Sequence, residues 1–293
     1  MNILLKQQYT SEDFNTHCAF LFPSLEDIPE KWLSTQELNF VKRVNTNSPD
    51  ETVIPVHRAN YSWFCILPKP NENPAKKLEN IRLAGYQLTQ FLHKERIDEL
   101  HISSFHASSL DLFALAEGIV LSSYAFQKYQ NNEKKRKHQL QTLDILSENF
   151  DYKQLKELEI ITEAVYLCRD LVNEIPSELN AKSLAEILKQ KAEEVGIRAE
   201  VMNKKKIESL KMGGLLGVNK GSTIPPTFTI LEWKPFNFIN EKPIILIGKG
   251  ITFDSGGMNI KTGTYMENMK SDMAGAATVA SVVIAAALSL IHI

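Results

Sequence analysis

Four side chains that could bind a divalent cation or stabilise a negative charge lie between residues 249 and 272: Lys249, Asp254, Lys261 and Asp272. The first two belong to the glycine-rich segment 248–257 (GKGITFDSGG), whose four glycines let the backbone approach a ligand closely. The segment contains neither of the common phosphate-binding signatures, and a carboxylate would repel a phosphate unless a metal lay between them. Carboxylates in such a loop favour a hard or borderline divalent cation.

Each of these residues also has a purely structural explanation. Asp254 could close an Asx turn, and Asp272 could be the N-cap of a helix that follows it. Lys249 and Lys261 could be solvated loop lysines. No HExxH or GxSxG signature occurs, and the seven histidines show no spacing typical of metal ligands. Taken singly, the residues leave both explanations open.

The elements on either side of the loop would position these residues. Residues 243–247 (PIILI) are apolar at every position, which predicts a central strand covered on both faces. The glycine-rich loop would then follow the carboxyl end of a strand, where open α/β sheets bind ligands. Asp272 precedes an Ala- and Val-rich segment at 273–287, which predicts a helix that this carboxylate caps.

Strands and helices alternate along the rest of the chain. The pattern predicts strands at 61–67, 100–105, 198–202 and 227–233, and helices at 75–95, 110–129, 153–173 and 184–195. Gly196 follows the last of these helices and is expected to end it in the left-handed conformation. The alternation predicts an α/β protein with a mainly parallel sheet in its first half, a second α/β half, and a boundary near residues 150–160.

Composition and charge limit the classes of function. The 293 residues suggest two domains, and 33 basic against 35 acidic residues leave no basic field of the kind that nucleic-acid binding needs. The basic cluster 134–137 is therefore better explained as a solvated loop. The three cysteines (Cys18, Cys65 and Cys168) form no CxxC pair, and the N-terminus lacks the apolar core of a signal peptide. We therefore expect a cytoplasmic protein without disulfides or a nucleic-acid partner.

The apolar C-terminal stretch, residues 273–293, is long enough to suggest a membrane anchor. It is rich in Ala and lacks a flanking basic cluster and an aromatic belt, which favours a packed helix over a membrane partner. Its last six residues, 288–293 (LSLIHI), do not fit that helix. They match the translation of a common transposon-derived sequencing adaptor, which predicts that they are foreign to the protein.

Four segments, in order along the chain, resemble the leucyl aminopeptidase family of cytosolic two-metal exopeptidases. The most specific is GKGITFDSGGMNIK at 248–261 with MENMKSDMAGAA at 266–277, which resembles the family's signature region. The others are AEGIVLSSY at 116–124, YLCRDLVNEIP at 166–176 and MGGLLGVNKGS at 212–222. The match is strong between residues 110 and 287 and faint before them.

The resemblance implies a role for each candidate residue. Asp254 would bridge two divalent ions, and Lys249 and Asp272 would complete one metal position. A lysine ligates a cation only as the free amine, so the charge of the metals must displace its proton. Lys261 would remain cationic and stabilise the oxyanion that forms at the scissile carbonyl. Met269 would line the pocket for the first side chain of the substrate, which suits leucine.

The resemblance also implies the fold, cofactors and partners. It implies a macro-like α/β domain at 1–150, a connecting helix at 151–175, and the first part of an α/β zinc-peptidase catalytic domain at 176–293. Two divalent ions, Zn²⁺, Mn²⁺ or Mg²⁺, would activate water and capture the free α-amine of a peptide substrate, in a homohexamer. The family's remaining two carboxylates and an arginine lie in an NTDAEGR-type segment that does not occur here. We therefore expect a C-terminally truncated chain that is inactive alone.

Two other functions stay open at this point. One is a non-enzymatic relative that keeps the fold, and the other is a membrane-tethered protein that uses residues 273–293. The presence of both lysines and both aspartates at the family's spacing favours the enzyme. Solubility of the purified chain without detergent would argue against the tethered protein.

Overall fold

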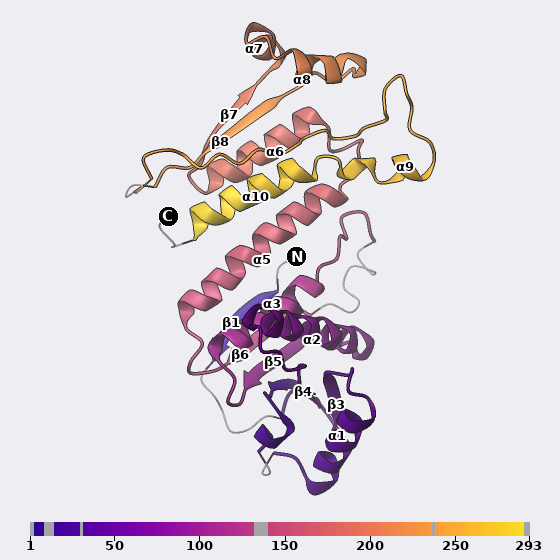
Figure 1. The fold of residues 1–293 in the computed structure, drawn as a ribbon, viewed down its shortest axis with the longest axis vertical. Helices are drawn as coiled ribbons and strands as arrows, with labels where there is room; N and C mark the ends of the chain where they lie inside the picture. The colour runs from indigo at the N-terminus through magenta and orange to yellow at the C-terminus, as the bar shows by residue number, and fades with distance from the viewer. Residues whose placement is uncertain are drawn as a thin grey trace. The chain divides into compact units, whose positions relative to one another are not determined.

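The computed structural model describes residues 3–8, 15–29, 32–131, 140–235, 238 and 240–289. It divides the chain into two compact units, Met1–Thr162 and Glu163–Ile293, whose elements are drawn in Figure 1. The basic cluster 134–137, which we expect to be a solvated loop, lies outside the described residues, and so do residues 290–293.

The first unit is built on a six-stranded sheet with the order β1-β6-β5-β2-β4-β3 (Figure 1). Its strands are β1 (Leu4–Gln8), β2 (Cys18–Leu21), β3 (Val53–His57), β4 (Ser62–Ile66), β5 (Glu99–Ser104) and β6 (Thr142–Leu146). All neighbouring strands are parallel except β3 and β4. The predicted mainly parallel sheet is therefore confirmed, as are the strands at 61–67 and 100–105, while the sequence pattern misses the other four.

The helices of the first unit are η1 (Leu25–Asp27), α1 (Thr35–Asn47), α2 (Pro74–Glu95) and α3 (Ser109–Ser122). The predicted helix 75–95 is confirmed, since the Asn73 side chain caps its start and Arg96 ends it in the left-handed conformation. The predicted helix 110–129 ends earlier than expected. The hydroxyl groups of Ser122 and Ser123 donate to carbonyls of the preceding turn, which competes with continuation of the helix.

The core of the first unit forms around β2 and β4, whose residues are buried at every position. Cys18 and Cys65 lie in this core as free thiols. Burial raises the pKa of Cys18 to about 11 and that of Cys65 to about 12. Both thiols are therefore protonated at neutral pH and act as small apolar side chains.

Two glycines allow α2 and α3 to pack backbone against backbone. A Cβ atom added at Gly118 would lie 2.3 Å from the carbonyl oxygen of Arg82, and one at Gly85 would lie 2.8 Å from the backbone nitrogen of Ile119. Because both contacts involve backbone atoms, no side-chain rotation relieves them. Any residue other than glycine would push the two helices apart.

We expect Gly118→Ala to lower the free energy of unfolding by about 1–3 kcal/mol, because the backbone of α2 must move to admit the methyl group. Gly214→Ala is the matched control, since Gly214 lies in helix α8 (Gly213–Val218) with nothing within 4 Å of its added Cβ. There alanine should be neutral or stabilise by up to about 1 kcal/mol. Urea denaturation measures the difference, and equal midpoints for the two variants would contradict the packing.

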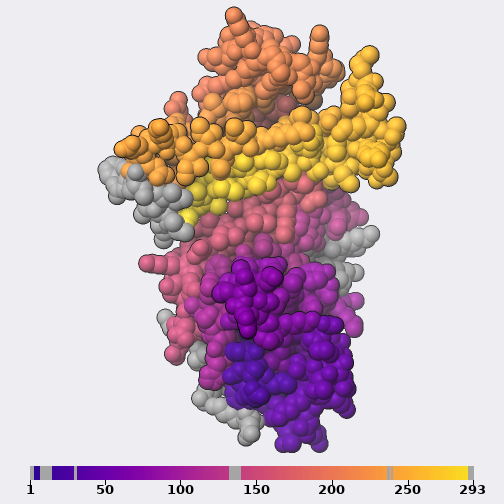
Figure 2. All heavy atoms as spheres, viewed as in Figure 1, coloured from indigo at the N-terminus to yellow at the C-terminus, as the bar shows by residue number. Residues whose placement is uncertain are grey.

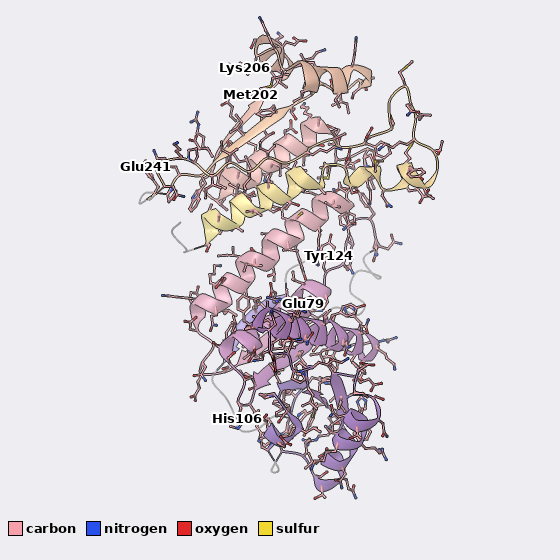
Figure 3. The ribbon with its side chains drawn as sticks, in the orientation of Figure 1. Glu79, His106, Tyr124, Met202, Lys206 and Glu241 are labelled. Carbon is pink, nitrogen blue, oxygen red and sulfur yellow. The ribbon has the colours of Figure 1, made fainter. Side chains whose placement is uncertain are left out.

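The second unit combines helices with a two-stranded antiparallel sheet. Helix α5 (Tyr152–Asn173) contains the boundary between the units, and α6 (Ala181–Glu194), β7 (Arg198–Met202), α7 (Lys204–Ser209), α8, η2 (Asn219–Gly221) and β8 (Phe228–Glu232) follow. Figure 3 labels Met202 at the end of β7 and Lys206 in the helix that comes next. These elements confirm the predicted helices at 153–173 and 184–195 and the predicted strands at 198–202 and 227–233. Gly196 has the expected positive φ, 77°.

The predicted central strand at 243–247 is wrong. These residues form no strand, and Ile244, Ile245 and Ile247 are 70%, 75% and 90% exposed. In Figure 2 the orange part of the chain that contains them lies at the surface. The physical reason is that a strand needs a neighbour for its backbone hydrogen bonds, and within the described ranges β7 and β8 pair only with each other. An apolar run predicts a covered strand only if other elements cover it.

The predicted Ala-rich helix is confirmed as α10 (Ala274–Leu288), which follows α9 (Thr264–Glu267) and η3 (Met269–Ser271). Within the described chain, Thr264–Leu288 is long and apolar enough to cross a membrane by length and composition. Its continuous α-helix has 15 residues, however, or about 22 Å, which is shorter than the roughly 30 Å hydrocarbon core of a bilayer. Ala277 and Ala280 are buried in a cluster with Leu184 and Leu188 of α6, which favours a packed helix.

Candidate metal centre

Close backbone contact between the glycine-rich loop and α10 brings the candidate residues together. The backbone N–H of Ala276 donates to the carbonyl of Lys249 at 2.8 Å. A Cβ atom at Gly248 would lie 2.4 Å from the carbonyl oxygen of Gly275, and one at Gly275 would lie 2.9 Å from the backbone nitrogen of Lys249. Glycine at both positions permits this approach, which places Lys249 beside the residues that precede α10.

Lys249 and Asp272 form an ion pair at this contact. The Lys249 Nζ lies 2.7 Å from Asp272 Oδ1, and the Asp272 side chain is only 16% exposed. Its second oxygen, Oδ2, is buried and has no hydrogen-bond partner among the described residues. A buried carboxylate oxygen without a partner is costly, and a bound cation would satisfy it.

Asp272 does not cap α10, and that prediction is wrong. The helix begins at Ala274 with Met273 in the cap position, and the Met273 side chain makes no capping hydrogen bond. Asp272 has φ −67° and ψ −5°, a helical conformation rather than the extended one of an N-cap residue. Its carboxylate is directed to Lys249 instead of to the first turn of the helix.

Asp254, Lys261 and Met269 form a second group. The Lys261 Nζ lies 3.0 Å from Asp254 Oδ2 and 3.0 Å from the Met269 sulfur. Asp254 Oδ1 accepts the backbone N–H of Gly256 at 2.9 Å, so Asp254 does close an Asx turn. Gly256 has φ 90°, and its added Cβ would lie 2.4 Å from the carbonyl oxygen of Asn259. The turn therefore requires glycine, and it holds both charged side chains.

The charge of Lys249, in the first group, acts on Asp254, in the second. The backbone N–H of Gly256 and then the Lys261 ammonium hold the pKa of Asp254 below its ordinary value, and the Lys249 ammonium adds a smaller effect of the same sign. Asp254 is therefore a carboxylate at neutral pH. Lys249 of the first group is therefore close enough to Asp254 of the second to act on its charge.

This set of donors fits a divalent cation with carboxylate and amine ligands. Asp254, Asp272 and Lys249 supply oxygen and nitrogen atoms of the types that Zn²⁺ and Mn²⁺ accept. In the part of the chain that the structure describes, no three His, Cys, Asp or Glu side chains gather closely enough to hold a metal by themselves. A cation here would therefore use Lys249 as well, and it would satisfy the unpartnered Oδ2 of Asp272.

We expect Gly248→Ala to weaken Mn²⁺ binding by the full-length product of the gene about tenfold to a hundredfold, because the loop that carries Lys249 must move away from α10. Gly250→Ala is the matched control, since its added Cβ would meet only the side chain of Ala276, at 3.4 Å. The control should bind Mn²⁺ within about threefold of the wild type. Isothermal titration calorimetry measures both, and equal affinities would contradict the role of the contact.

The part of the chain that holds this site matches a known family. The catalytic domain of the cytosol aminopeptidase family matches residues 166–293. A probable cytosol aminopeptidase of a Sulfurihydrogenibium species is 36% identical over 283 residues, covering 89% of this chain and 55% of that protein. Over this region the chain is similar to the cytosol aminopeptidase family. A second probable cytosol aminopeptidase, from Chlorobaculum parvum, is 54% identical over 119 residues, covering 41% of this chain and 24% of that protein. The chain spans about half the length, or less, of these curated relatives.

Solved structures of a leucine aminopeptidase and of a bottromycin maturation enzyme share the fold. A mutant of tomato leucine aminopeptidase superposes with a TM-score of 0.76 at 21% identity, covering 98% of this chain and 59% of that chain. The bottromycin maturation enzyme in complex with Mn superposes with a TM-score of 0.73 at 22% identity, covering 93% of this chain and 56% of that chain. The predicted α/β fold is therefore confirmed, and the superposition extends to the first half, where the sequence resemblance is faint.

Gly275 is the residue of the site that the sequence pattern misses. Its contact with Gly248 and Lys249 joins the loop to α10, although the two segments are separated along the chain. The available signal was the run of small residues that opens the helix (AGAA, residues 274–277), since small side chains permit close approach of a backbone.

Proposed function

We propose that the chain belongs to a metal-dependent aminopeptidase that hydrolyses N-terminal residues, leucine in particular, from peptides. The observation that supports this most directly is the buried, unpartnered Oδ2 of Asp272 beside Lys249, whose charge also acts on Asp254. The match of residues 166–293 to the catalytic domain of the cytosol aminopeptidase family supports the reaction class. The proposal concerns the full-length product of the gene, since this chain spans 55% of the length of a curated relative.

Lys249, Asp254 and Asp272 would hold two divalent ions, Zn²⁺, Mn²⁺ or Mg²⁺. Bound ions of this kind polarise the carbonyl, activate a water molecule and bind the free α-amine, which restricts hydrolysis to the N-terminal residue. Asp254 is suited to contact both ions, because its two oxygens already face different partners, the N–H of Gly256 and the Lys261 ammonium.

Lys261 would remain cationic and stabilise the negative charge that develops on the carbonyl oxygen of the substrate. Its Nζ lies 3.0 Å from a carboxylate oxygen of Asp254 and 3.0 Å from the Met269 sulfur, so it lies between a metal ligand and the pocket residue. Met269 would contact the first side chain of the substrate, and its flexible, apolar thioether suits leucine.

We infer a cytoplasmic homohexamer with a macro-like first domain at 1–150, a connecting helix at 151–175 and the first part of the zinc-peptidase domain at 176–293. The names of the curated relatives, cytosol aminopeptidase, support the location. Three metal-binding side chains are few for a two-metal site, so the 293-residue chain alone should be inactive. The exposed apolar residues at 244–247 should also make it prone to self-association.

Removal of metal should abolish release of leucine from leucine p-nitroanilide by the full-length product, and Mn²⁺ or Zn²⁺ should restore it, because the ions supply the activated water. Initial rates before and after chelation measure this. Hydrolysis that a chelator does not affect would contradict the proposed function. Chelator-sensitive release by the 293-residue chain would instead show that its site is sufficient without further ligands.

A further inference from the structure

The short helix η3 carries a lysine whose hydrogen-bond acceptor is a residue outside the candidate metal centre, Asn173. Met269, at its start, contacts Lys261, and Asp272, directly after it, contacts Lys249. Between these two residues lies Lys270, whose Nζ donates to the backbone carbonyl of Asn173 at 2.9 Å. Met269 and Asp272, two residues of the proposed site, thus lie within two positions of a lysine that contacts another helix.

The acceptor is well suited to a cation. Asn173 is the last residue of α5, and the last carbonyls of a helix have no partner inside it. The partial negative charge at the C-terminus of a helix favours a lysine there. The half-buried Lys270 ammonium therefore satisfies a carbonyl of α5 and fixes η3 to a 22-residue helix.

The contacts within η3 are too few to hold it alone. Its turn is closed by three local hydrogen bonds. The N–H and the hydroxyl of Ser271 donate to the Asn268 carbonyl at 3.0 Å and 2.7 Å, and the N–H of Asp272 donates to the Met269 carbonyl at 3.2 Å. A helix of 3 residues gains little from its own backbone. The position of Asp272 therefore depends on the tertiary contacts on either side of it, and Lys270 supplies one of them.

We propose that Lys270 is a positioning residue, which fixes Met269 and Asp272 in the geometry of the metal centre by joining η3 to the end of α5. This inference rests on the proposed function. Lys270 could instead act only through its charge, which would repel a divalent ion nearby. The two roles predict opposite results, because removal of a repelling charge strengthens metal binding and loss of the anchor weakens it.

The test compares Lys270→Met and Lys270→Arg in the full-length product, with Lys205→Met, an exposed lysine of α7, as the control. Hydrogen exchange of residues 268–274 is measured without metal, and Mn²⁺ affinity by calorimetry. We expect Lys270→Met to speed exchange about fivefold, the effect of one lost hydrogen bond, and to weaken Mn²⁺ binding about tenfold. Lys270→Arg should keep the exchange rate and the Mn²⁺ affinity close to those of the wild type, and Lys205→Met should change neither quantity.

Unchanged exchange in Lys270→Met, or Mn²⁺ binding that is equal or tighter than in the wild type, would overturn the inference. Failure of the proposed function is distinguishable, because the wild-type protein would then bind no Mn²⁺. Since the exchange measurement needs no metal, it decides in that case whether Lys270 anchors η3.

Discussion

Asp254→Ala should lower kcat/KM for leucine p-nitroanilide by about three orders of magnitude or more in the full-length product of the gene. Loss of a residue that only supports a metal ligand already costs about 10–100-fold. The loss should be larger here, because Asp254 would itself ligate both ions. The change also removes the acceptor for Gly256 and the partner of Lys261. Steady-state rates measured across a range of Mn²⁺ concentrations would show the loss, which saturating metal should not reverse.

Asp254→Asn separates the two roles of this side chain. The amide keeps an oxygen that can accept the N–H of Gly256 at the Asx turn, but it loses the negative charge. We expect it to be nearly as inactive as the alanine variant. Glu241→Ala, which removes an exposed carboxylate, should keep full activity. Wild-type rates in Asp254→Ala, or an active Asp254→Asn enzyme, would show that the residue forms a turn and binds no metal.

Lys261→Ala should lower kcat by about 10²–10³, the cost of one lost donor to an oxyanion, while KM changes little. Its metal content should stay that of the wild type, since Lys261 is proposed to act on the substrate and not on the ions. Measurement of kcat, KM and bound metal in the same preparation tests both statements.

Lys242→Ala is the control for this change, because Lys242 is an exposed lysine outside the proposed site. It should leave kcat unaltered. If Lys261→Ala loses its metal, then the contact with Asp254 at 3.0 Å serves to hold the ligand in place, and the proposed role on the oxyanion is wrong.

The sequence identifies the candidate charged residues but not how they pair. Motif spacing identifies Lys249 and Asp272 as candidates, yet their contact at 2.7 Å depends on the approach of Gly248 to Gly275. Such a tertiary contact has no local periodicity that could reveal it. For the same reason Asp272 resembles an N-cap in the sequence, since a carboxylate before an Ala-rich helix is typical of one.

The helices and strands also divide into those that local signals in the sequence predict and those that depend on contacts between distant segments. The helix at 75–95 could be predicted because its boundaries are local: a capping Asn73 before Pro74, and a long periodic pattern. Strand pairing is not local, and residues 243–247 show the consequence. Their composition predicts a covered strand, whereas the described residues provide no strand that pairs with them. The sequence pattern also continues past Ser122, where serine hydroxyls compete for the helix carbonyls.

Anomalous diffraction at the manganese edge, from crystals of the full-length product grown with Mn²⁺, tests the proposed metal centre most directly. We predict a peak within bonding distance of the carboxylates of Asp254 and Asp272 and of the Lys249 Nζ, with the ion pair between Lys249 and Asp272 opened to admit the ion. A map without a peak there, in which Lys249 still contacts Asp272 as it does here at 2.7 Å, would contradict the assignment of these residues as metal ligands.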